Sequence, residues 1–175
     1  TTSGPTTAAY RKAVDIMGEK ADVDIQLLAV PGIRHSIVSD RAITTVENRF
    51  DALYIMDIEE RDTLNSVVTG SKQTVNIQNT VDNFRERGLD SSFAAAYFPD
   101  VMSSVEIKTF DPSTKTTTSQ VNISQVPPSV SVLGAFALND SIGYPWLAPA
   151  GFKRGVLNAT DVTVSLNSDD LDDLY

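Results

Sequence analysis

Residues 24–57, DIQLLAVPGIRHSIVSDRAITTVENRFDALYIMD, hold two apolar runs separated by an amphipathic stretch. The run from Asp24 to Val30 is stopped by Pro31-Gly32, which is typical of a buried strand ending in a turn. The run from Asp51 to Asp57 is a second candidate for a buried strand. Between them, residues 36–49 place four apolar side chains at helical spacing: Val38, Ala42, Ile43 and Val46. The stretch predicts a strand, a helix and another strand.

The alternation of predicted helices and strands continues on both sides of this stretch. Upstream, a helix is predicted from Thr6 to about Lys20, because one face collects Tyr10, Ala13, Val14, Met17 and Ala21. Downstream, a helix over about residues 76–87 stops at Gly88, and residues 91–99 (SSFAAAYFP) form a third apolar strand. This β-α-β-α-β order predicts a parallel sheet with helical crossovers.

The pattern changes after residue 100. Residues 105–110 and 116–123 alternate polar and apolar side chains around a turn at 111–115, which predicts an antiparallel hairpin with one wet face. Residues 161–166 predict a last strand. We expect an α/β fold with a mixed sheet: a parallel β-α-β-α-β core, flanking helices and an antiparallel hairpin, all in one domain over residues 1–175.

A double proline opens the segment 126–157, VPPSVSVLGAFALNDSIGYPWLAPAGFKRGVL. Proline is favoured at the first helical position, so a helix is predicted from Pro128 to about Asn139. A helix that is apolar nearly all round is expected to be buried, here with one face of Val130, Leu133, Gly134 and Ala137. Asp140 is the only acidic or basic residue between Pro127 and Ala150, so this segment is a poor candidate for a catalytic site.

The composition excludes several classes of function. The formal net charge is −9, which disfavours binding to a nucleic-acid backbone, and the pairs Arg85/Arg87 and Lys153/Arg154 are too isolated to form a basic patch. The chain has no cysteine and one histidine, so thiol catalysis, disulfides, His-based triads and His-pair metal sites are excluded within it. No apolar run approaches the roughly 20 residues of a membrane span, and no signal peptide is recognisable.

The best enzymatic candidate is the acidic stretch Asp57-Ile-Glu-Glu-Arg-Asp62, directly after a predicted buried strand. Ligands gather at the carboxyl ends of strands in open α/β sheets, and Asp57, Glu59 and Glu60 could hold Mg²⁺ there. A solvated acidic loop is the favoured interpretation, because no phosphate-binding motif accompanies the stretch: Gly70-Ser71-Lys72 lacks the first glycine of a P-loop. We therefore expect no cofactor and no catalytic residue.

Three other features have a plain structural interpretation beside a functional one. His35 could act as a lone acid or base, but a role at the start of a helix or facing solvent is favoured. Trp146 could stack on a ligand, but burial as a loop anchor is favoured. The acidic run from Asp169 to Asp173 lacks the spacing of a calcium loop and suggests a capped helix start.

Several segments resemble, in order, the contractile tail sheath proteins of phages, phage-tail-like bacteriocins and, more distantly, type VI secretion systems. Val30-Pro-Gly32, the strand end Tyr54 to Asp57 and Ala94 to Pro99 are similar to the family's upstream segments. The signature stretch is matched from residue 126 to 155, and its structural residues here are Pro127, Pro128, Ser129, Gly134, Asp140, Trp146, Ala148, Pro149, Gly151 and Arg154. Val130, Leu138 and Asp100 depart from the family pattern, as in a divergent member, such as one from a large phage.

The resemblance implies a structural protein rather than an enzyme. Sheath subunits surround a tail tube and contract to drive it through the host envelope without a nucleotide or cofactor. The implied partners are other sheath subunits and the tube, with no nucleic acid or membrane, and the implied locations are the virion tail and, during assembly, the host cytoplasm. The chain begins with Thr1 and ends in an acidic run, so we expect a fragment of a longer subunit, monomeric by itself, with residues 168–175 starting the link to a carboxy-terminal domain.

Overall fold

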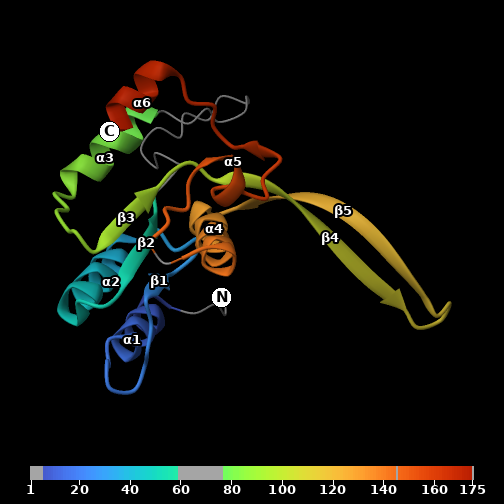
Figure 1. Cartoon of the computed structure of the whole chain (residues 1–175), viewed down its shortest axis with the longest axis horizontal. Coiled ribbons are helices and arrows are strands. Elements are labelled where there is room, and N and C mark those ends of the chain that lie inside the picture. The colour runs from blue at the N-terminus through green and yellow to red at the C-terminus, as the bar shows by residue number, and fades with distance from the viewer. Residues whose placement is uncertain (1–5, 59–76, 145, 175) are drawn as a thin grey trace. The chain divides into compact units, whose positions relative to one another are not determined.

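The computed structural model describes residues 6–58, 77–144 and 146–174 (Figure 1). The chain forms two compact units. The first contains residues 1–98 and 166–175, and the second contains residues 99–165.

The first unit is built on the predicted parallel sheet. Its strands are β1 (Leu27–Ala29), β2 (Leu53–Asp57) and β3 (Ala94–Tyr97), in the order β1-β2-β3, and both pairings are parallel. In the register, Leu28 lies beside Tyr54 and Ile55 lies beside Ala95. The β-α-β-α-β prediction is confirmed.

The central strand explains why the sequence reads as a continuous apolar run. Tyr54 and Ile55 point to opposite faces of the sheet because they are adjacent in a strand, and each is only 1% exposed. When both faces of a strand are buried, the side chains on both faces are apolar, so the sequence shows no alternation of polar and apolar residues. Around it, the core consists of Val14, Leu28, Ala42, Ile43, Val46, Ala52 and Met56.

The helices of this unit follow the predicted spans closely. They are α1 (Thr7–Met17), α2 (Ser36–Arg49), α3 (Ile77–Glu86) and the carboxy-terminal α6 (Ser168–Leu174). Gly88 has a φ of 57°, the left-handed conformation expected of a helix stop. At the start of α6, Asp170 N donates to Asn167 Oδ1 at 2.8 Å and Asn167 N donates to Asp170 Oδ2 at 3.0 Å. This reciprocal cap confirms the predicted helix start in the acidic run.

The second unit contains the predicted hairpin, formed by β4 (Val101–Asp111) and β5 (Thr116–Val126). Figure 1 shows it as a long two-stranded ribbon extending away from α4 (Pro128–Ile142) and α5 (Gly151–Arg154). The predicted last strand is shorter than expected: β6 (Asp161–Val162) pairs only with Val101 and Met102. The sheet order is β5-β4-β6.

The hairpin does not have one wet and one dry face, so that prediction is wrong. Val105 lies opposite Asn122, whereas Val121 lies opposite Glu106. Directly opposed residues share a face, so Val105 and Val121 lie on opposite faces, and each face of the hairpin carries some apolar residues. The exposed residues of the two faces include Val105 and Ile107 on one, and Phe110, Val121 and Ile123 on the other.

The expected burial of the double-proline helix is also wrong. Pro127 caps α4 and Pro128 begins it, as predicted, but the buried residues are Pro128, Ser129, Ala135 and Asn139. Of the expected inner face, Val130, Gly134 and Ala137 are exposed and Leu133 is half-buried. Because the helix is apolar all round, its sequence does not indicate which side is buried. Two polar residues take buried positions, and Asn139 Nδ2 donates to Leu147 O at 2.8 Å.

Candidate functional site

The carboxylate of Asp57, at the end of β2, makes a structural hydrogen bond. Asp57 is the last residue of β2 and is 4% exposed. Its Oδ2 accepts a hydrogen bond from Gly32 N at 3.0 Å, which ties the turn after β1 to the end of β2. Glu59 and Glu60, the other residues of the predicted magnesium site, lie outside the described residues. Within the described part of the chain, no group of three acidic or histidine side chains could hold a metal.

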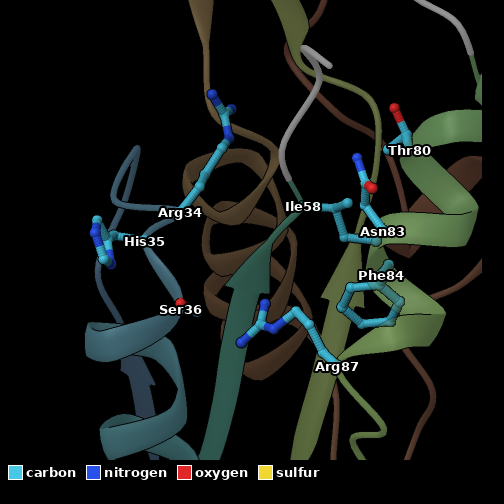
Figure 2. Close-up of a pocket in the computed structure, with 8 residues that line it drawn as sticks. All are labelled: Arg34, His35, Ser36, Ile58, Thr80, Asn83, Phe84 and Arg87. Atoms are coloured by element: carbon cyan, nitrogen blue, oxygen red, sulfur yellow. The ribbon is translucent and has the colours of Figure 1, made fainter. Parts of the chain in front are cut away.

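A cavity of about 240 Å³ lies near the carboxyl end of β2, within the first unit (Figure 2). Arg34, His35 and Ser36 line it from the start of α2, and Thr80, Asn83, Phe84 and Arg87 line it from α3 and the residue that follows that helix. Ile58 completes the described lining. Two guanidinium groups are among these side chains, and one of them, that of Arg87, is paired with the Asp40 carboxylate.

Arg87, which lines this cavity, makes hydrogen bonds across the sheet to α2. Figure 2 shows it reaching from the end of α3 across β2. Its Nη2 donates to Ser39 Oγ at 2.7 Å and to the carboxylate of Asp40, both on α2. Its Nε is buried and has no hydrogen-bond partner among the described residues. Sequence reasoning missed this group because it tested Arg85 and Arg87 only as part of a nucleic-acid patch.

His35 has the structural role that the sequence favoured. It is the N-cap of α2, and its Nδ1 accepts a hydrogen bond from Ile37 N at 3.3 Å. In Figure 2 the imidazole turns away from Asn83 and Arg87. The ring therefore serves the helix end, and no described partner gives it the geometry of a general base.

The predicted signature residues are spread along one segment of the second unit. Ser129 is fully buried, whereas Gly134, Asp140 and Ala148 are exposed, and Pro149 and Arg154 are half-buried. Gly151 has a φ of 77°, which favours glycine at the start of α5. A Cβ at Gly134 would meet no atom within 4 Å, so packing within the described chain does not require that glycine.

Trp146 is not a buried loop anchor, and that interpretation is wrong. It is 76% exposed, and its ring stacks on Tyr144 with centroids 4.7 Å apart and planes 2° from parallel. The side chain of Phe152, at the second position of α5, is fully exposed. Three aromatic side chains near each other in the sequence are thus available to a partner.

Exposed apolar side chains are concentrated in the second unit. Apart from Pro128, Val101 and Ala135 are its only buried hydrophobic residues among those described, whereas the first unit holds the rest of the buried core. Most of the exposed large hydrophobic residues of the described chain lie in this unit: Val105, Ile107, Phe110, Val121, Ile123, Val130, Leu138, Ile142, Tyr144, Trp146, Phe152, Val156, Leu157 and Val162. We call these residues the apolar surface of the second unit. Contiguous exposed apolar patches mark sites of protein contact, so these residues are candidates for contacts with a partner.

No protein-family model, curated protein or solved structure matches the chain. Among the described residues, none of the helices has the length and apolar character needed to cross a membrane.

Proposed function

We propose that the chain belongs to a structural subunit of a contractile tail sheath, which surrounds the tail tube and drives it through the host envelope. Its partners are other sheath subunits and the tube, and its location is the virion tail after assembly in the host cytoplasm. Two independent lines support the proposal. One is the ordered resemblance of the sequence segments, and the other is the apolar surface of the second unit.

The apolar surface is the single observation that carries the proposal. A solvated protein gains roughly 25 cal/mol for each Å² of apolar surface removed from water, so a unit that leaves most of its large hydrophobic residues exposed gains stability from contacts with neighbours. A subunit repeated many times in a lattice supplies such neighbours without a second kind of protein. An enzyme needs a convergent polar site, and the second unit presents apolar and aromatic side chains instead.

The apolar surface also suits a change between two lattices. Contraction requires contacts that can be exchanged for a better set, and packed interfaces switch between discrete arrangements. The two faces of the hairpin carry separate apolar groups, Val105 with Ile107 and Val121 with Ile123. Two faces could contact different neighbours in the extended and contracted states. The work of the stroke then comes from interface energy, with no nucleotide.

The test is immunogold labelling of contractile tails with antibodies raised against this chain. Tails are imaged from a lysate of the cells that produce the protein, and the control is the same serum adsorbed with purified chain. We expect regular labelling along the sheath in both extended and contracted tails. Labelling confined to soluble material, with bare sheaths beside it, would overturn the proposal.

The chain by itself is expected to remain monomeric and to form no tubes. Its apolar residues are divided between opposite hairpin faces and the segments after β5, whereas a stable dimer buries roughly 1,200–2,000 Å² in one contact. Sedimentation and negative-stain microscopy of the purified chain test this expectation, and tubes of this chain alone would contradict it.

A further inference from the structure

The outer edge of β5 is open along the strand. In the sheet order β5-β4-β6, β5 is the last strand on its side, and within the described part of the chain no strand pairs with its outer edge. The residues of β5 before Val126 are all exposed. Figure 1 shows the strand along one side of the projecting ribbon. An unpaired strand edge presents a row of backbone N–H and C=O groups that can pair with another strand.

The sequence of β5 lacks the features by which proteins protect such an edge. Exposed edge strands are commonly short, or carry charged side chains, proline or a bulge. β5 has 11 residues, and its sequence TTTSQVNISQV holds no charged residue, no proline and no glycine. Its pairing with β4 runs from Thr116 to Val126 without a bulge. The neighbouring strand β4, in contrast, carries Glu106 and Lys108. Of the two strands of the ribbon, β5 therefore has the edge that is suited to pairing.

The distribution of charge favours a second copy of the chain as the partner of this edge. The formal net charge is −9, so two copies repel each other in most orientations. No charged residue lies between Lys115 and Asp140, so β5 belongs to a stretch without local repulsion. A two-stranded ribbon is also only marginally stable by itself in water, and additional strands stabilise it. Pairing of two β5 edges would supply these strands without bringing like charges together.

We propose that β5 pairs antiparallel with β5 of a second copy of this chain, about a two-fold axis at Asn122. In this register Val121 of each copy lies opposite Ile123 of the other, so four exposed apolar side chains form one cluster on one face. The two Asn122 side chains lie opposite each other, and each amide can donate to and accept from the other. The two ribbons then form one continuous sheet in the order β4-β5-β5-β4.

This pairing is expected to be weak. It joins the two copies along a single strand edge, whereas a stable dimer buries roughly 1,200–2,000 Å². We expect a dissociation constant on the order of 1 mM, so the chain is monomeric in dilute solution and pairs when copies are crowded together. The inference is independent of the sheath proposal and concerns the unassembled chain, because copies related by a two-fold axis face each other, whereas the subunits of a ring follow one another head to tail.

Disulfide trapping tests the register, because the chain has no native cysteine. Asn122→Cys places the thiols of two copies opposite each other, and the Cα–Cα distance of about 4.5–5.5 Å between opposed residues of antiparallel strands permits a disulfide. Thr118→Cys introduces the same thiol at an exposed position on the same face of β5 but away from the axis, so the two copies of this residue are far apart in the paired register. Both variants are oxidised in a glutathione buffer at equal protein concentration, and non-reducing electrophoresis measures the dimers.

The Asn122→Cys variant is expected to give at least about tenfold more disulfide-linked dimer than Thr118→Cys, because pairing raises the effective concentration of its thiols. In the unchanged chain, dilution from about 1 mM should shift the NMR resonances of β5 amides and leave those of α2 in place. Equal dimer yields from the two variants would refute the proposed register. Concentration-dependent shifts confined to Tyr144, Trp146 and Phe152 would assign self-association to these aromatic residues, and the proposal would then be wrong.

Discussion

Arg49 and Asp51 form an ion pair with 2.9 Å between Nε and Oδ1, and the Arg49 side chain is only 2% exposed. The remaining nitrogens donate to Met17 O at 2.6 Å and to Val23 O at 2.9 Å. Arg49 thus connects the end of α2 to the end of α1 and to the chain that enters β1. Its hydrogen bond lowers the pKa of the Asp51 carboxyl.

Substituting Arg49 with Ala is expected to destabilise the first unit by about 3 kcal/mol, because the change leaves two backbone carbonyls without their donor and empties a buried position. Urea unfolding followed by circular dichroism measures the loss. Arg41→Ala is the matched control: its pair with Asp15 joins α2 to α1 at the surface, with side chains 43% and 36% exposed. That change should cost under about 1 kcal/mol, and equal losses in the two variants would show that Arg49 is not an anchor.

Ionisation of the Tyr54 phenol makes the free energy of unfolding depend on pH in the alkaline range. Burial, reinforced by the Asp57 carboxylate, raises its pKa from 10.0 to about 12. The unfolded chain loses the phenol proton near pH 10 while the folded chain keeps it, so stability present below pH 10 falls as the pH rises toward 12. The full loss is roughly 2–3 kcal/mol at about 1.4 kcal/mol per pH unit.

Tyr54→Phe should remove this alkaline loss, and Tyr144→Phe, a change of the same atoms at a residue that is 63% exposed, should leave it unchanged. Unfolding free energies between pH 9 and pH 11.5 (about the range in which tyrosines titrate) measure the slopes. Equal slopes in the unchanged chain and in Tyr54→Phe would contradict the assignment.

The acidic strand end is expected to bind Mg²⁺ no more tightly than roughly millimolar, because one Asp57 oxygen already accepts the Gly32 N–H. Calorimetric titration with MgCl₂ measures the affinity, with Asp57→Asn as the comparison. Tighter binding that disappears in Asp57→Asn would restore the interpretation of a metal-binding or hydrolase-like module.

Trp146 is the only tryptophan and reports directly on the apolar surface. In the purified chain its fluorescence should be quenched by acrylamide nearly as strongly as that of a free indole, because the side chain is 76% exposed. Tyr144→Ala removes the stacked ring and should increase the accessibility further. Strong protection of Trp146 in the monomer would show instead that the loop is folded over it.

The parallel sheet and its helices could be predicted from sequence because each signal was local. Val38, Ala42, Ile43 and Val46 repeat at helical spacing, and the run from Asp51 to Asp57 has the continuous apolarity of a central strand. The helix stop at Gly88 and the helix cap formed by Asn167 and Asp170 could be predicted for the same reason, because each depends on residues that are close together in the sequence.

The faces of the hairpin and of α4 could not be predicted in the same way. Whether Val105 shares a face with Val121 depends on the register between two strands, and each strand shows only its own alternation. The cavity beside β2 depends on Arg87 crossing to Ser39 and Asp40, contacts separated by nearly fifty positions in the sequence. Exposure of Trp146 was missed because apolar residues were assumed to be covered by their own chain.

The most direct test of the proposed function is a cryo-electron microscopy map of the assembled particle that contains this chain. We predict repeated copies in rings around a tube, with Trp146, Phe152 and at least one apolar face of the hairpin buried in contacts between copies. A map in which the chain is repeated around no tube, or in which Trp146 and Phe152 face solvent in every copy, would contradict the account.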